Sequence, residues 1–510
     1  MSRVSKKSKN GGSFAQLAIV FAVASLLSAA AVWFCWHNGY TLYYGDAESH
    51  LNHARRVWDS RTPGYDQLGT VWLPLPHLLV MPLAAVDHLW RSGLAGAIPS
   101  AASFVVGAVF FFATVRRLFG AAAAAASLGI LATNPNLLYL QSTPMNEPIF
   151  FACFAAVLYF TVRGSAVGAG LAALAGTLTR YEGWFLIPFV ALYFLVTAKG
   201  RRLRSAAVFC ILASIGPAAW LAHNYWYSGN FLEFYNGPSS PRVIQGMAPY
   251  PGRESWAQAW QYYSAAVVLC IGWPALALAG AGVAAAAIRR VAWPLALLAL
   301  PGVFYIWSMR YSGGTPIFVP NLWPNSYYNT RYGLVLLPLA ALAAGALVTF
   351  IPSQLRKFAV ALIVLAGASP WLARPPRERC ITWTESEVNS VARRAWTAQA
   401  ADILRARYGP GDGVFTTFGD VTGVFRTAGI PLRKTLTWDN WPHWPAAAAR
   451  PDLFLWERWA VAVAGDPVQS AILKSQLRGP HYTLEKRIIV AGAPVIEIYR
   501  REVRLPEKTD

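Results

Sequence analysis

The feature that most constrains this chain is the recurrence of apolar blocks about as long as a membrane-crossing helix. Residues 14–36 and 334–350 contain no charged side chain, and a helix needs roughly 20 apolar residues to cross a bilayer. Of the 510 residues 55% are hydrophobic and 13% are charged, whereas a soluble domain carries about 25% charged residues. The sequence therefore predicts an α-helical polytopic membrane protein.

The apolar blocks divide into about eleven predicted spans. Ten of the spans are expected at about 14–36, 94–115, 121–140, 144–162, 165–180, 181–198, 205–226, 291–309, 332–351 and 358–373. The eighth span follows an outer loop at about 227–260 and ends at Arg289-Arg290. Residues 71–90 contain three prolines, and they are predicted to lie along the membrane surface rather than to cross it.

The basic residues set the predicted orientation. Basic side chains near the N-terminus (Arg3 and Lys6), the pair Arg116-Arg117, residues 199–204 and the pair Arg289-Arg290 all fall on one side of this scheme, which the positive-inside rule assigns to the cytoplasm. The N-terminus is then inside the cytoplasmic membrane, and residues 37–94 and 375–510 are outside. The net charge of +20 is explained by these loops, so no nucleic-acid partner is expected.

The composition changes near residue 375. Residues 1–374 are predicted to form the transmembrane domain, and residues 375–510 a small extracytoplasmic α/β domain with a helix at 392–407 and short strands at 413–418, 453–456 and 494–499. A further helix is predicted at 47–58, where apolar residues recur on one face.

Several ionisable residues fall on the outer side of the predicted topology. They are Asp46, Glu48 and His50 after the first span, Glu147 before the fourth, Arg180, Tyr181 and Glu182 between the fifth and sixth, and Arg331 and Tyr332 at the start of the tenth. Ionisable residues at the edge of a membrane are costly, and each is a functional hypothesis. Their common side allows distant segments to line one cavity.

These motifs resemble those of the GT-C glycosyltransferases, a superfamily that includes protein O-mannosyltransferases and the lipid A aminoarabinose transferases of glycosyltransferase family 39. The segment Tyr43-Tyr44-Gly45-Asp46-Ala47-Glu48-Ser49-His50 is similar to the first outer loop of that family. Pro144-Met145-Asn146-Glu147-Pro148 resembles its second acidic position, where an aspartate is usual. Thr179-Arg180-Tyr181-Glu182-Gly183 and Asn329-Thr330-Arg331-Tyr332 resemble its two basic-tyrosine elements.

The resemblance covers about residues 1–373 and implies a function. It implies a transferase that moves a hexosyl or pentosyl group, with inversion, from a polyprenyl-phosphate donor to a protein, glycan or lipid acceptor in the cell envelope. It implies Asp46 as general base, Glu48 and Glu147 as assisting acids, and Arg331-Tyr332 and Arg180-Tyr181 at the donor phosphate, with Glu182 and His50 in support. The sequence requires no cofactor. A divalent metal is possible, because the Asp-x-Glu spacing also resembles that of oligosaccharyltransferases, whose acids bind one.

Ordinary structural roles compete with these assignments. Asp46 stands before a helix, where aspartate is a favoured N-cap, and Glu147 suits a helix start. Arginines at span ends commonly extend toward the interface, and two histidines one turn apart, His50 and His53, lack a third metal ligand. At the level of the whole chain, a multi-span transporter and a non-catalytic envelope assembly protein are the alternatives; a transporter would be expected to show internal repeats, and none is evident.

Overall fold

The chain divides into two compact units, each built from several segments. In the computed structural model the described residues are 2–502 without 199, 313, 376, 377 and 418, and of residues 2–13 only the backbone is described. The helical unit comprises Met1–Thr41, Thr70–Leu79 and Gly96–Glu385, and the sheet unit comprises Leu42–Gly69, Val80–Ala95 and Ser386–Asp510. The two units are therefore not separated by the single domain boundary between residues 374 and 375 that the sequence predicted. Parts of the predicted orientation and of the predicted C-terminal domain fall outside the described residues: the N-terminal basic side chains, Lys199 and residues 503–510.

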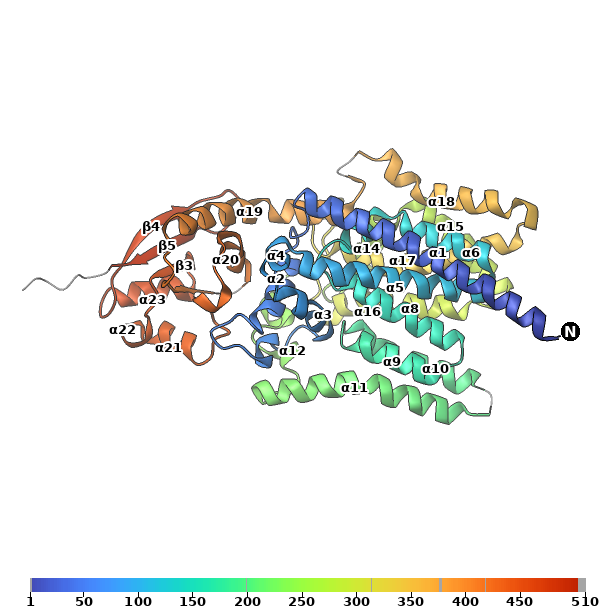
Figure 1. Ribbon diagram of the computed structural model, residues 1–510, viewed down its shortest axis with the longest axis horizontal. Helices are drawn as coiled ribbons and strands as arrows, with labels where there is room; N and C mark the ends of the chain where they lie inside the picture. Colours follow the sequence, from blue (N-terminus) through green and yellow to red (C-terminus); the bar gives the residue numbers. More distant parts are fainter. Residues whose placement is uncertain (1, 199, 313, 376–377, 418, 503–510) are drawn as a thin grey trace, which may run out of the picture. The chain divides into compact units, whose positions relative to one another are not determined.

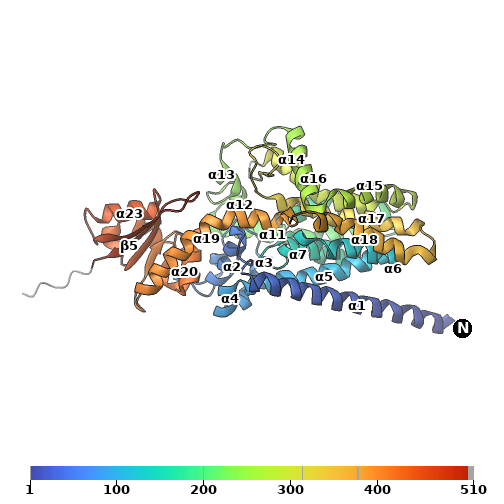
Figure 2. The same cartoon turned by 90° about the horizontal axis from the view of Figure 1, so that it is seen from above.

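The helical unit is a bundle of apolar helices (Figures 1 and 2). Its helices are α1 (Ser2–His37), α5 (Leu94–Phe119), α6 (Ala121–Ala132), α7 (Pro135–Leu140), α8 (Glu147–Val162), α9 (Ala166–Thr177), α10 (Glu182–Thr197), α11 (Arg202–Ser228), α12 (Glu233–Asn236), α13 (Pro241–Gln245), α14 (Trp256–Ile271), α15 (Trp273–Ile288), α16 (Trp293–Tyr311), α17 (Leu337–Ala346) and α18 (Arg356–Ala373), with the 3₁₀ segments η2 (Thr330–Leu336), η3 (Leu347–Phe350) and η4 (Ser353–Leu355). α3 (Leu75–Ala84) begins in this unit.

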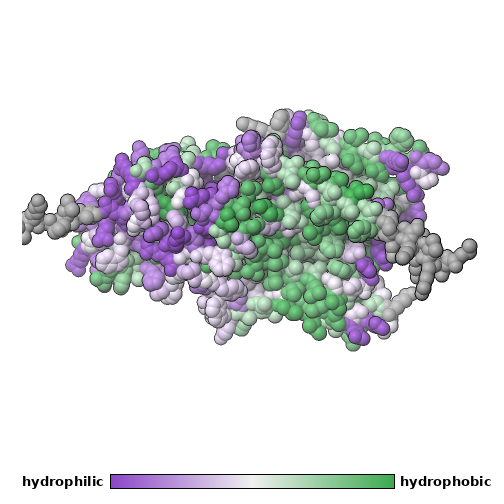
Figure 3. All heavy atoms as spheres, in the orientation of Figure 1, coloured by the Kyte–Doolittle hydropathy of each residue, from purple (hydrophilic) through white to green (hydrophobic). Residues whose placement is uncertain are grey.

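The prediction of a polytopic membrane protein is confirmed. Among the described residues, five segments are long and apolar enough to cross a membrane: Phe14–His37, Leu94–Phe119, Arg202–Ser228, Thr330–Phe350 and Ser353–Ala373. A sixth is added if α14 and α15, which meet at 105°, count as one span. α6, α8, α9 and α10 are shorter apolar helices where full spans were expected, so the number of about eleven spans stays a prediction. The hydrophobic colouring over the helices in Figure 3 agrees with a lipid-facing surface.

Two predicted spans are interrupted for local reasons. The span expected at 121–140 is two helices, because α6 ends at Ala132 and Asn134 caps a new helix, α7. The Asn134 side chain accepts hydrogen bonds from the backbone N–H groups of Asn136 and Leu137, with Pro135 as the first helical residue. Between α14 and α15 the backbone at Gly272 has φ +84°, a conformation that glycine adopts without steric cost.

In the part of the chain that the structure describes, the sheet unit has five strands in the order β2-β1-β3-β5-β4. The strands are β1 (Val414–Thr416), β2 (Thr435–Leu436), β3 (Trp459–Val463), β4 (Tyr482–Ile488) and β5 (Ile496–Arg501). β1 pairs in parallel with β2 and β3, whereas β5 is antiparallel to both β3 and β4. The expected α/β fold of the C-terminal part is therefore confirmed. The strand predicted at 453–456 is wrong, because Pro451 starts the short helix α22 (Pro451–Phe454), and the neighbouring strand begins only at Trp459.

Helices from both ends of the sequence complete the sheet unit. They are α2 (Gly45–Arg56), η1 (Tyr65–Leu68), α4 (Asp87–Ser92), α19 (Ile381–Arg407), which begins in the helical unit, η6 (Gly419–Val421), α20 (Thr422–Ala428), η7 (Leu432–Lys434), α21 (His443–Ala449) and α23 (Pro467–Ser475). Leu51 of α2 and Trp90 of α4 share one buried apolar core with Trp396 of α19 and Phe425 of α20. The helix predicted at 47–58 thus exists as α2, and its apolar face is covered by the C-terminal part of the chain.

Close helix packing in the helical unit yields a test of the fold. A Cβ added at Gly282 of α15 would lie 1.9 Å from the carbonyl oxygen of Ala343 on α17, whereas one added at Gly280 would meet nothing within 4 Å. Small residues let membrane helices approach this closely. We expect Gly282→Ala to lower the melting temperature of the detergent-solubilised protein, at a cost of about 1–3 kcal/mol from overpacking. Gly280→Ala is the matched control on the same helix, and equal melting temperatures for the two variants would contradict this packing.

Candidate functional site

Helix starts and a 3₁₀ turn bring the charged residues of the helical unit together. Glu147 is the first residue of α8 and Glu182 the first of α10. Arg180 lies in the short connection before α10. Arg331 lies in η2, directly after Asn329, whose backbone has φ +56°. An asparagine tolerates this left-handed conformation better than most residues.

Arg180 is bound by two carboxylates and a phenol. Its Nε donates to Glu182 Oε1 at 2.8 Å, and one terminal nitrogen donates to Glu147 Oε1 at 3.1 Å. The other terminal nitrogen donates to the hydroxyl of Tyr305 at 2.6 Å, and that hydroxyl donates to Glu182. All three nitrogens of this guanidinium therefore donate a hydrogen bond.

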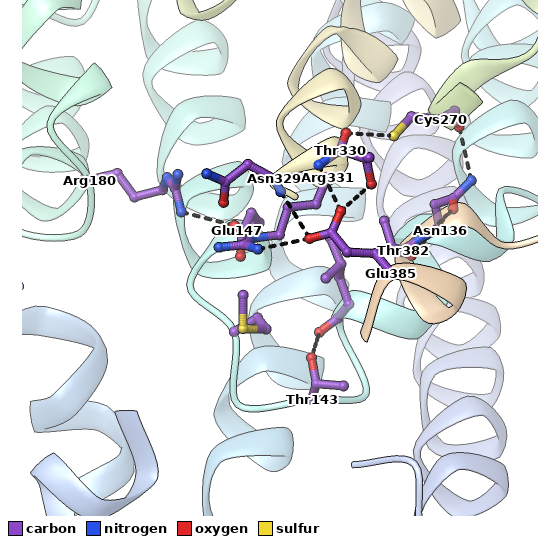
Figure 4. A network of polar contacts seen from close by, with 12 residues as sticks. Asn136, Thr143, Glu147, Arg180, Cys270, Asn329, Thr330, Arg331, Thr382 and Glu385 are labelled. Carbon is purple, nitrogen blue, oxygen red and sulfur yellow. Dashed lines mark hydrogen bonds and ion pairs between the residues drawn. The ribbon is translucent and has the colours of Figure 1, made fainter. Parts of the chain in front are cut away.

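Arg331 approaches the same carboxylate from the other side (Figure 4). Its Nε donates to Glu147 Oε1 at 3.1 Å, and a terminal nitrogen donates to Glu385 Oε1 at 3.3 Å. Arg180 and Arg331 thus converge on one oxygen atom of Glu147. The other oxygen of Glu147, Oε2, is buried and has no hydrogen-bond partner among the described residues.

Glu385 is a member of this network that the sequence analysis missed. It lies in α19, four residues after the helix begins at Ile381, and is almost fully buried. It accepts hydrogen bonds from the backbone N–H of Asn329 at 3.1 Å and of Thr330 at 2.7 Å, as well as from the Thr330 hydroxyl. Burial raises the pKa of this carboxyl above its usual range, although the charge of Arg331 acts in the opposite direction. A single glutamate outside any motif gives no sequence signal for such a role.

The network lines one end of a small cavity, which is polar at that end and has apolar walls elsewhere. The cavity encloses about 50 Å³, more than the roughly 10–15 Å³ that one water needs. Its lining is charged at Glu147, Arg180, Glu182 and Arg331, aromatic at Tyr305 and Tyr332, and otherwise apolar: Leu131, Leu137, Phe150, Phe151, Phe154, Leu334, Val335, Leu337 and Pro338.

The two tyrosines predicted at the donor phosphate, Tyr332 and Tyr181, differ in whether they line the cavity. Tyr332 lines the cavity, stacks on Tyr305 with ring centroids 4.4 Å apart, and has the guanidinium of Arg331 at 5.1 Å from its ring centroid. Tyr181 does not line it: its hydroxyl donates to the carbonyl of Val71 at 2.7 Å and accepts from the indole of Trp220 at 3.1 Å. Tyr181 therefore supports the fold around Arg180.

The first acidic motif lies in the sheet unit. α2 begins at Gly45 and its N-cap is Tyr44, with no side-chain cap. Asp46 is therefore inside the first helical turn, and the N-cap interpretation is wrong. In that position a carboxylate still interacts favourably with the helix dipole.

Glu48 is held by two arginines from the C-terminal part of the sheet unit. Its Oε2 is 2.5 Å from a terminal nitrogen of Arg393, and its Oε1 is 3.0 Å from Nε of Arg426. Both carboxylate oxygens are thus ion-paired, and the side chain is 7% exposed. Such a carboxylate is well placed to orient its surroundings and poorly placed to collect a proton.

The donor atoms near Asp46 do not fit a divalent metal site. No group of three or more histidine, cysteine, aspartate or glutamate side chains has metal-binding geometry among the described residues. The oxygens of Glu48 are taken by arginines, and His53 has its Nδ1 2.8 Å from the carbonyl of Ser49. His50 is buried in α2. No chemical step is therefore assigned to a metal.

The predicted site residues thus fall into two groups. The helical unit brings together Glu147, Arg180, Glu182, Arg331 and Tyr332, which the sequence spreads over about 190 positions. The sheet unit holds Asp46, Glu48 and His50 and surrounds Glu48 with residues that no motif indicated.

Comparisons with known proteins support the expected resemblance. Residues 87–226 match the model of the dolichyl-phosphate-mannose-protein mannosyltransferase family. No curated protein matches the chain. The fold is similar to that of ArnT from Cupriavidus metallidurans bound to undecaprenyl phosphate, with 15% identity, a TM-score of 0.58 and coverage of 94% of this chain and 97% of that one.

Two further solved structures are similar. ArnT of the same organism in the apo state has 16% identity and a TM-score of 0.56, covering 94% of this chain and 98% of that one. The oligosaccharyltransferase of Archaeoglobus fulgidus in the apo form has 12% identity and a TM-score of 0.48, covering 88% of this chain and 69% of that one. The resemblance to GT-C glycosyltransferases and the GT-C-like fold with a small C-terminal sheet domain are confirmed.

The geometry at Glu385 predicts a strong effect on stability. Glu385→Ala leaves Arg331 and two backbone N–H groups without this acceptor, and breaking a buried ion pair typically costs about 3–5 kcal/mol. We expect a clear drop in melting temperature in detergent. Glu387→Ala, two residues along α19 and only partly buried, is the control and should melt like the wild type. A stable Glu385→Ala variant would show that Arg331 does not depend on this carboxylate.

Proposed function

We propose that this protein is a membrane glycosyltransferase that transfers a sugar from a polyprenyl-phosphate donor to a hydroxyl acceptor on the extracytoplasmic side of the membrane. The observation that carries the proposal is the convergence of Arg180 and Arg331 on one oxygen of Glu147, at the head of a cavity with apolar walls. The GT-C-like fold supports it, and so does the similar fold of ArnT, whose structure holds undecaprenyl phosphate.

The two arginines suit a donor phosphate. A guanidinium is always charged and can form two parallel hydrogen bonds to phosphate oxygens. The apolar walls, with Phe150 and Leu337 among them, suit the first part of an isoprenoid chain. In the proposed binding mode, the donor phosphate therefore lies between the two arginines, and its isoprenoid chain extends along the apolar walls of the cavity.

The charge balance of the network adds a condition to this mode. Two arginines face three carboxylates, those of Glu147, Glu182 and Glu385. With the carboxylates ionised, the network has no positive excess to attract an anion. Since Glu147 Oε1 occupies the point where both guanidiniums meet, phosphate oxygens would replace it there, and Glu147 would turn toward the reacting groups.

The chemistry of transfer needs a base near the acceptor. The acceptor hydroxyl loses its proton, its oxygen forms a bond to the anomeric carbon, and the bond from that carbon to the phosphate oxygen breaks. A positioned carboxylate accepts the proton, and the leaving polyprenyl phosphate gains a negative charge that arginines stabilise. We assign Asp46 as the base, and Glu48 and Glu147 as residues that orient the reacting groups. A single displacement of this kind inverts the anomeric centre.

Substitution of Arg331 tests the phosphate role. Arg331→Ala should raise the donor KM and slow transfer, measured with a radiolabelled polyprenyl-phosphate sugar in liposomes. Arg331→Lys should restore activity only in part, because an ammonium lacks the planar two-pronged geometry. Arg163→Ala, an exposed arginine after α8, is the control. Wild-type kinetics in a folded Arg331→Ala variant would exclude the phosphate role.

Substitution of Asp46 tests the base. Asparagine has nearly the same shape but cannot accept the proton, so Asp46→Asn should reduce transfer by about 100-fold or more. Loss of the helix-dipole interaction should cost only about 0.3–1 kcal/mol, so the melting temperature should change little. Asp66→Asn, at an exposed position of the same unit, controls for the loss of one carboxylate. If Asp46→Asn remains active, Asp46 is not the base and Glu147 becomes the candidate.

A further inference from the structure

The acidic motif around Asp46 is enclosed by charged side chains from the C-terminal part of the sheet unit. Arg393 of α19 is central to this enclosure, and its side chain is only 9% exposed. One terminal nitrogen of Arg393 binds Glu48 Oε2 at 2.5 Å, and the other donates to the carbonyl oxygens of Tyr43 at 2.7 Å and Leu42 at 3.4 Å. One guanidinium therefore binds the chain on both sides of Asp46.

A second contact on Glu48 restricts it further. Arg426 of α20 donates through Nε to Glu48 Oε1 at 3.0 Å, and one of its terminal nitrogens donates to the carbonyl of Arg91 at 2.7 Å. A Cβ added at Gly423 would lie 2.7 Å from Glu48 Oε1, so a larger residue there would require the carboxylate to shift. Glu48 is thus fixed by two cations.

A third carboxylate, that of Asp420, lies near those of Asp46 and Glu48. Asp420 Oδ1 is 3.9 Å from Nε of Arg393 and would be 3.5 Å from a Cβ at Gly45, the residue before Asp46. Its side chain is 63% exposed, so it stays in contact with solvent. Arg393 is therefore the cation that Glu48 and Asp420 share.

The energetics of these contacts favour a role in geometry. A buried ion pair pays a large desolvation cost, so it contributes little net stability. A planar guanidinium with several simultaneous acceptors fixes their relative positions. A catalytic base misplaced by about 1 Å can lose roughly 100-fold in rate.

We propose that Arg393 is a positioning residue for Asp46: by binding the carbonyls of residues 42 and 43 and the carboxylate of Glu48, it holds the first turn of α2 in its catalytic geometry. The C-terminal part of the chain then contributes a residue that positions Asp46, in addition to forming its own fold. This inference rests on the proposed function, in which Asp46 is the base.

The test compares Arg393→Gln and Arg393→Lys with Arg405→Gln in the full-length protein. Arg405 lies on the same helix, is exposed and pairs with Asp402, so it controls for the loss of an α19 arginine. For Arg393→Gln we expect kcat to fall about 10- to 100-fold, with the donor KM within about 2-fold of the wild type, because the arginines proposed at the phosphate are untouched. Arg393→Lys should recover part of kcat, since one ammonium cannot serve all three acceptors.

Hydrogen exchange gives a readout that does not depend on activity. Amides of residues 42–50 should exchange at least about 10-fold faster in Arg393→Gln than in Arg405→Gln, while strands β3 and β5 keep their protection. Equal exchange at 42–50, or equal kcat in these two variants, would overturn the positioning role. If the wild-type protein transfers no sugar, the proposed function fails, and the exchange comparison still decides whether Arg393 orders this segment.

Discussion

A guanidinium removed from water must find oxygen acceptors inside the protein, and this requirement organises both groups of candidate residues. Arg180 and Arg331 share Glu147, with Glu182 and Glu385 as outer partners. Such networks add little stability relative to an apolar core, but losing any one partner leaves a buried charge without compensation. Chain segments far apart in sequence are consequently held in one arrangement.

The same physical rule separates residues that can react from residues that hold geometry. Glu48 has both oxygens bound by arginines, whereas Glu147 has one oxygen shared by two arginines and one without a partner among the described residues. Identical side chains in similar motifs therefore have different chemical availability. In the proposed binding mode, the oxygen without a partner among the described residues makes Glu147 the carboxylate most ready to exchange partners.

The sequence was sufficient for features that depend on local pattern. Apolar block length predicted the membrane-spanning class, and spacing predicted α2 and the β5 region. It also singled out Arg331 and Glu147, since charged residues at span ends are conspicuous in an apolar chain. It could not identify Glu385, Arg393 or Arg426, because their roles come from contacts across 54 or more positions. The strand predicted at 453–456 failed because an apolar run of four residues does not distinguish a strand from a short helix.

The assembly of the sheet unit from three stretches of sequence has a consequence for how this architecture can be inherited. Leu51 and Trp90 come from segments that lie between the first and second predicted spans, yet they share a core with Trp396 and Phe425. A recombination event that exchanged only the region after the last span would bring in a partial core and leave apolar faces of α2 and α4 uncovered. The C-terminal region is therefore not a free module appended to a membrane domain. Its sequence is expected to change together with that of Leu42–Gly69 and Val80–Ala95, and lineages that lose one should lose the other.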